Sequence, residues 1–276
     1  MCRVVLMIAV LLPTHAISQD KNYVDVSGVT GSATLTDNKT LADVQQEALK
    51  EAKVKALRKA GISENITKNQ ILITEQSDNE FRQSFNEISQ VELDGAITDW
   101  EIIEQSKKID LNDDLIVKIT INARVIKYKS RNDPSFNAKL EGFSAVYEVG
   151  EPVKFSIRPT KNAYMTIFNF SEDYAQVIYP LNFHQNSYLL KGHTYHAPFT
   201  EDLSNYKAEL AHDKTMESNR LVVVLTREKI NFNWSNEISG NLAKETKTSM
   251  KQVLSWINRI EPKNRQVFYR SYIVKR

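Results

Sequence analysis

The 276-residue chain has one cysteine, Cys2, and only eight glycines and seven prolines. A single cysteine excludes an internal disulfide bond, and it excludes zinc ribbons and iron–sulfur sites, which need several thiolates. The low glycine and proline content excludes a collagenous or low-complexity chain. Hydrophobic residues make up 41% of the chain and charged residues 25%, a composition typical of a packed globular protein of one or two domains.

Long hydrophobic runs are also missing, apart from one at the N-terminus. Residues 4–12 are all apolar, and Ala16 and Ser18 place small side chains at the two positions that precede a cleavage site. This pattern predicts a signal peptide over residues 1–18, cleaved near Ser18. We therefore expect an exported protein, periplasmic or extracellular, with no transmembrane segment in the mature chain. Because Cys2 precedes the apolar run, we expect no lipid anchor.

Charge divides the remaining chain into two parts. Acidic residues outnumber basic ones in 19–129, and basic residues outnumber acidic ones in 130–276. A polar segment at 127–134 separates them and contains a proline. We predict a small α/β interaction domain over 19–129 and a β-sandwich-like domain of unknown function over 130–276.

In the first part, one helix is strongly indicated. Thr40 and Asp43 form a capping-box pattern, small and apolar residues then recur every three or four positions, and Gly61 supplies a C-terminal stop. The apolar stripe is mostly alanine, which predicts that the helix lies close on a sheet. The other elements expected here are strands at 23–35, 66–74, 91–105 and 115–126 and a short helix at 81–88, with a glycine-dependent bulge in the first strand.

The second part has the rhythm of a sandwich, with short β-branched segments and turn signals between them. Strands are expected at 138–147, 153–157, 164–170, 175–179, 221–226 and 266–274, and a helix at 241–258. The predicted fold class is α+β: an Ala-rich helix on a sheet, then a β-sandwich-like domain with a C-terminal helix.

Two resemblances accompany these patterns. The segments VSGVTGSATL, TLADVQQEALKEAKVKALRKAG and DLIVKITINARV, within residues 24–126, resemble the N-terminal domain of the flagellar assembly protein T family and related bacterial surface lipoproteins. The segments YEVGEPVKFSI, AYMTIF and QVIYP, followed by Leu190, Lys191 and Gly192, resemble a bacterial exported domain-of-unknown-function family. The first resemblance implies a role in assembly and interaction; neither supplies catalytic residues.

Catalytic motifs are missing from the sequence. It has no G-x-S-x-G, H-E-x-x-H or phosphate-binding glycine loop. Four histidines do fall in one stretch, from His184 to His212, and they keep open an alternative function, a periplasmic hydrolase or metal-binding enzyme. His193 and His196 point opposite ways on a strand, which argues against a metal site. We expect no enzyme activity, no cofactor and no metal.

An aromatic-rich loop at 179–199 is the better candidate for binding. The candidate partner-binding residues are Phe183, His184, Tyr188, Tyr195 and His196, because aromatic rings with polar handles suit recognition surfaces. Tyr188 and Tyr195 are expected to point outward, because polar or turn-prone residues flank them, whereas Tyr179 ends an apolar run and is expected in the core. The alternative is that the rings close the end of the sandwich, in which case Tyr188 and Tyr195 are buried as well.

Together these observations predict a non-enzymatic exported accessory or binding protein of the bacterial envelope, assisting secretion or surface assembly. Its partner would be a protein or an envelope component. Export and a net charge of only +2 argue against nucleic acid. The sequence leaves the oligomeric state open.

Overall fold

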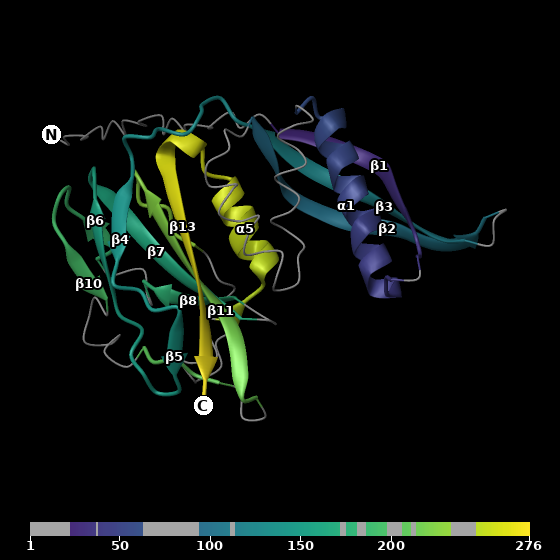
Figure 1. Cartoon of the computed structure of the whole chain (residues 1–276). Coiled ribbons are helices and arrows are strands. Elements are labelled where there is room, and N and C mark those ends of the chain that lie inside the picture. The colour runs from purple at the N-terminus through teal and green to yellow at the C-terminus, as the bar shows by residue number, and fades with distance from the viewer. Residues whose placement is uncertain are drawn as a thin grey trace, which may run out of the picture.

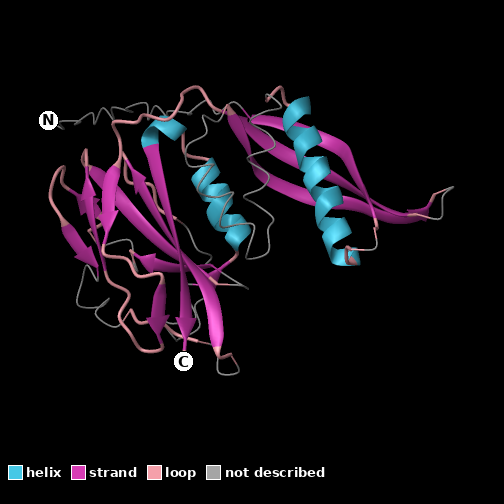
Figure 2. Ribbon diagram, in the orientation of Figure 1, coloured by secondary structure: helices cyan, strands magenta, loops and turns pink. Residues whose placement is uncertain are grey.

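The computed structural model describes residues 23–36, 38–62, 94–110, 114–171, 175–180, 186–197, 206–210, 214–232 and 247–276. Within these ranges the strands form three sheets, and the α-helices α1 and α5 pack on them (Figures 1 and 2). The α+β class is confirmed. The predicted signal peptide, the strand expected at 66–74 and the helix expected at 81–88 lie outside the described residues.

The first sheet is antiparallel, with strand order β1-β3-β2. It consists of β1 (Tyr23–Thr34), β2 (Gly95–Ile109) and β3 (Leu115–Lys127). The predicted bulge is present in β1, because the register shifts between Val26 and Val29, and Gly28 has φ 65° there. The predicted long hairpin is β2 and β3.

Helix α1 (Leu41–Lys59) begins with the predicted capping box of Thr40 and Asp43. Ala48 and Ala52 on its buried stripe are fully inaccessible. Opposite them on β1, a Cβ built on Gly31 would lie 2.0 Å from the Ala48 carbonyl oxygen and 2.3 Å from the Ala52 nitrogen. The helix therefore contacts the strand backbone directly, which only small residues on both sides permit.

The second part is a sandwich of a large and a small sheet. The large sheet has the order β12-β8-β7-β11-β13-β5, with β9 also paired to β7. Its strands are β5 (Val146–Glu148), β7 (Ala163–Phe170), β8 (Ala175–Tyr179), β9 (Tyr188–Leu189), β11 (Met216–Thr226), β12 (Lys247–Thr248) and β13 (Arg265–Lys275). The small sheet, in the order β10-β6-β4, has β4 (Ala138–Glu141), β6 (Phe155–Pro159) and β10 (Tyr195–Ala197).

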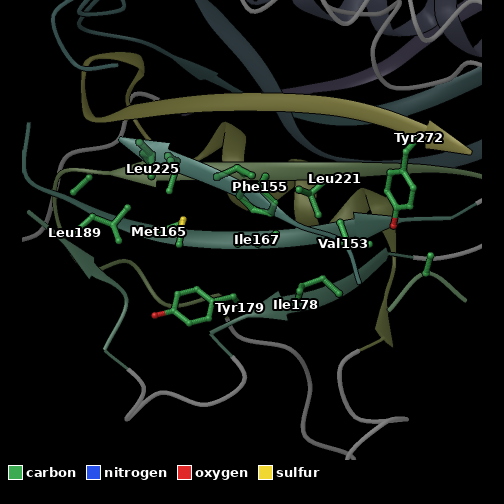
Figure 3. Close-up of a cluster of buried hydrophobic side chains, with 14 of the residues drawn as sticks. Val153, Phe155, Met165, Ile167, Ile178, Tyr179, Leu189, Leu221, Leu225 and Tyr272 are labelled. Carbon is green, nitrogen blue, oxygen red and sulfur yellow. The ribbon is translucent and has the colours of Figure 1, made fainter. Parts of the chain in front are cut away.

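The main core lies between these two sheets (Figure 3). Phe155 and Ile157 of the small sheet pack with Met165, Ile167 and Leu221 of the large one. Burying side chains of this size contributes about 1.5–3 kcal/mol each. Predicted core residue Tyr179 is confirmed, with 3% of its surface exposed.

Helix α5 (Met250–Asn258) covers the other face of the large sheet and also contacts β2. Val253 and Ile257 point into the large sheet's second core. The opposite helix face bonds the carbonyl oxygens of β2: Lys251 Nζ reaches Trp100 at 2.6 Å, Asn258 Nδ2 reaches Ile97 at 3.2 Å, and Ser255 Oγ donates to Thr98. A register shift at Thr98 accompanies these contacts.

The segment between the two parts is held by the second. The Tyr128 hydroxyl donates to the Asn258 carbonyl at 2.8 Å, and the Glu261 carboxylate accepts from the Ser130 hydroxyl at 2.9 Å. Farther on, Asp133 accepts from Ser135 and Lys161 and pairs with Arg227. Residues 128–133 are therefore docked by side-chain contacts, while the division into domains at 129/130 stays a prediction.

Two sequence expectations in the second part were wrong in detail. The strand expected over 138–147 is two strands, β4 and β5, because Gly142 adopts φ 77° between them and sends the chain from the small sheet to the large one. The helix expected from 241 begins at Met250, where Ser249 and Gln252 form a capping box, and 247–248 is strand β12 instead.

Gly31→Ala tests the close packing of α1 on β1. A methyl group there overlaps helix backbone, so we expect a loss of unfolding free energy of about 3 kcal/mol. Gly28→Ala is the control, since nothing lies within 4 Å of its added Cβ and only its positive φ is strained, a cost of about 1 kcal/mol. Urea unfolding measures both, and equal losses would contradict direct backbone contact.

Asp133→Asn tests the docking of residues 128–133 through the pH dependence of stability. Hydrogen bonds from Ser135, together with Lys161, hold the pKa of Asp133 far below its ordinary 3.8. A lowered folded-state pKa stabilises the fold above the unfolded-state value, and this stabilisation is lost as pH falls through the folded-state value. The variant should therefore be less stable than the parent at pH 7, with the deficit shrinking below about pH 4. Urea unfolding at pH 7 and below about pH 4 measures this difference. A stability deficit that is the same at both pH values would contradict the role given to the Asp133 carboxylate.

Candidate functional site

The loop from Asn186 to Ala197 connects the large sheet to the small one. Its first strand, β9, pairs with β7 of the large sheet, and its last strand, β10, pairs with β6 of the small sheet. We call residues 186–197 the 186–197 loop. Of the predicted aromatic region at 179–199, the structure describes this loop and residues 179–180.

Hydrogen bonds fix the turn of this loop at Gly192, whose φ is 75°. The Gly192 nitrogen donates to the Pro159 carbonyl at 2.8 Å, and the Gly192 carbonyl accepts from Arg158 Nε at 2.9 Å. The Lys191 nitrogen donates to Asn162 Oδ1 at 2.8 Å. Backbone and side chains of β6 and the turn after it thus set the conformation of the loop.

A further bond closes the loop on itself. The Leu190 nitrogen donates to the Tyr195 hydroxyl at 2.7 Å, while the Tyr195 ring packs against the main core. The loop is therefore ordered before any partner binds, which lowers the entropy cost of binding.

The ordered turn presents an apolar and a basic side chain to solvent. Leu190 is 45% exposed, and Lys191 and His193 are exposed as well. The outward side of the small sheet next to the turn bears Arg158 and His196. This arrangement suits contact with a surface that is partly apolar and partly acidic.

The predicted site residues separate into three groups. Phe183 and His184 lie outside the described residues. Tyr188 is half-buried and packs on Tyr164, with ring centroids 5.0 Å apart, and Tyr195 is half-buried on the core. His196 is exposed on β10, opposite Ser156.

Tyr188 and Tyr195 thus contribute largely to packing, whereas sequence reasoning expected them to point outward. It missed the exposed pair Leu190 and Lys191 as a candidate contact. The signal was present, because Lys191-Gly192 marks a turn, and turn tips hold outward side chains.

The histidine stretch does not assemble into a site among the described residues. His193 and His196 lie there, whereas His184 and His212 lie outside. The described part of the chain has no group of three histidine, cysteine, aspartate or glutamate side chains placed to hold a metal ion.

A cluster of polar side chains lies partly buried inside the sandwich. The Tyr272 hydroxyl donates to Asn169 Oδ1 at 3.0 Å and lies 3.2 Å from the Tyr206 hydroxyl, and Asn169 Nδ2 donates to Asn219. Burial raises the pKa of Tyr206 well above its ordinary value, so its hydroxyl remains neutral. The cluster links β7, β11 and β13, which is a structural role.

Tyr195→Phe and Tyr195→Ala separate the stability contribution of the hydroxyl from that of the ring. Loss of the hydroxyl removes one hydrogen bond, so we expect about 1 kcal/mol less stability for Tyr195→Phe. Loss of the ring from the core should cost about 3 kcal/mol. Thermal unfolding measures both changes, and a Tyr195→Ala cost within about 0.5 kcal/mol would place the ring on the free surface instead.

No α-helix in the described ranges is both long and apolar enough to cross a lipid bilayer.

Comparison with known proteins gives one match. Residues 146–229 match the family model described as Domain of unknown function (DUF4384), which agrees with the resemblance seen in the C-terminal part. The matched residues run from β5 to just after β11 and include the 186–197 loop. No family model matches the N-terminal part, so its resemblance to the flagellar assembly protein T family stays a hypothesis. No curated protein and no solved structure matches the chain.

Proposed function

We propose that the protein is a non-enzymatic, exported accessory protein of the bacterial envelope that binds a protein or envelope component through its 186–197 loop. The predicted signal peptide supports export, and the match to a domain of unknown function supplies no activity. The proposal includes a role in secretion or surface assembly, which rests on the N-terminal resemblance.

One observation supports the choice of surface more than any other. The loop is held by bonds from Pro159, Arg158, Asn162 and Tyr195, and yet it exposes Leu190 at its tip. A large apolar side chain on an ordered turn gains little for the fold, whereas it can enter a pocket on a partner at low entropy cost. The neighbouring Lys191 then favours a partner with acidic residues around that pocket.

Affinity capture from the native envelope tests this proposal. Leu190→Ala and Lys191→Glu should each reduce capture of the partner, by about tenfold for a contact at the centre of an interface. Both side chains are exposed, so unfolding free energy should change by no more than about 0.5 kcal/mol.

Met216→Ala is the matched control, because Met216 is also an exposed apolar residue, at 62%. It lies at the far end of the sheet: β11 begins at Met216, and its other end, Thr226, pairs with Tyr164, the neighbour of Tyr188. Capture should survive this change. Equal capture by all three variants would refute the loop as the binding surface.

A further inference from the structure

The outer edge of β2 is covered along only part of its length. Helix α5 bonds the carbonyl oxygens of Ile97, Thr98 and Trp100, and β3 occupies the inner edge of the strand. From Glu101 to Ile109, no strand among the described residues pairs with the outer edge. Figure 1 shows β2 and β3 continuing beyond α1 as a projecting ribbon.

This part of the edge, which is unpaired among the described residues, presents apolar side chains to solvent. Ile103 is 51% exposed and Ile109 is 69% exposed. Unpaired edges with exposed apolar residues tend to pair with another strand. The question is therefore which strand this edge fits.

The stretch from Glu104 to Ile109 is regular, because the bulge in this half of β2 lies at Ile103. Its register with β3 assigns the side chains to two faces. Gln105 and Lys107 lie opposite Ile119 and Val117, on the face that α1 covers in the centre of the sheet, and Glu104, Ser106 and Lys108 lie opposite Thr120, Lys118 and Ile116, on the other face.

The charges along this stretch complement those of a second copy only when the two strands run antiparallel. Glu104 comes two residues before Ser106 and Lys108 comes two residues after it. A second copy in antiparallel orientation, with the two-fold axis at Ser106, sets Glu104 against Lys108 twice and Gln105 against Lys107 twice. A parallel copy in register would set like charges together, which is unfavourable. In the part of the chain that the structure describes, Glu104 and Lys108 have no ion-pair partner.

We propose that residues 104–108 of β2 pair antiparallel with the same residues of a second copy, about a two-fold axis at Ser106. The two three-stranded sheets then form one continuous sheet. The bulge at Ile103 and the consecutive lysines Lys107 and Lys108 disfavour pairing with other strands, as edge bulges and lysines do generally. The antiparallel copy, in contrast, pairs the charges of Glu104 and Lys108. The proposal is independent of the 186–197 loop.

The dimer is weak, because one pair of short edges buries much less than the roughly 1,200 Å² of a standard stable interface. Sedimentation velocity of the purified full chain should therefore be followed from about 1 to 300 µM, the range of weak association. The expected result is a reversible shift from monomer to dimer. A chain that remains monomeric throughout this range overturns the proposal.

Charge reversal tests the register. Lys108→Glu and Glu104→Lys each turn two attractive pairs into repulsive ones, which should raise the dimer dissociation constant about tenfold. The double variant Glu104→Lys/Lys108→Glu restores both pairs and should return to within about threefold of the parent.

Lys107→Glu is the matched control. It makes the same change in net charge, but its position faces neutral Gln105 of the second copy, so the dissociation constant should change less than about threefold. If Lys107→Glu weakens the dimer as much as Lys108→Glu does, or if the double variant stays as weak as the single ones, the assigned register is overturned. Circular dichroism of each variant confirms that the fold is intact.

Disulfide trapping supplies a readout that does not depend on charge. In a Cys2→Ser background, Ser106→Cys places two thiols across the two-fold axis, at the Cβ separation of about 4.5–5.5 Å found for directly opposite residues. Lys118→Cys, the neighbour of Ser106 on β3 and on the same face, would lie roughly 14 Å from its symmetry mate. Mild oxidation should link the Ser106→Cys chains and leave the Lys118→Cys chains single. The reverse result, or no link in either, contradicts the pairing.

Discussion

The contact between α5 and the edge of β2 is the constraint on which the arrangement of the described parts depends. The nine-residue helix has two functional faces: Val253 and Ile257 close the second face of the large sheet, and Lys251, Ser255 and Asn258 bond the carbonyl oxygens of β2. Edge carbonyl groups need partners when they are covered, and here a helix supplies them. One short helix thus completes the core of one sheet and satisfies the backbone of another.

Trp100 strengthens this contact from both sides. Lys53 Nζ of α1 lies 4.0 Å from the centre of a Trp100 ring, and Lys251 Nζ of α5 lies 4.6 Å from it. Lys53 is 2% exposed, so its charge gains more from the indole than an exposed lysine would. Helices from the two parts of the chain therefore meet at one side chain of β2.

Sequence reasoning predicted the fold well where local signals agree. The capping box at Thr40, the alanine stripe and the hairpin were all readable, because each depends on neighbouring residues. It failed where long-range pairing decides: Gly142 marks a possible break in residues 138–147, but nothing local shows that β4 and β5 belong to different sheets. The site was predicted only in part, since the alternation of side chains cannot say that Tyr195 lies on the core and Leu190 lies outside. That outcome depends on the Pro159 and Arg158 contacts, more than thirty positions away in the sequence.

The position of β13 determines when the large sheet can form. Residues 265–275 are the last strand in the sequence, and yet they lie between β11 and β5, pairing antiparallel with one and parallel with the other. Until these residues are available, β11 has an open side and β5 has no neighbour among the described strands of the sheet. Folding must wait for contacts between distant segments, which slows it.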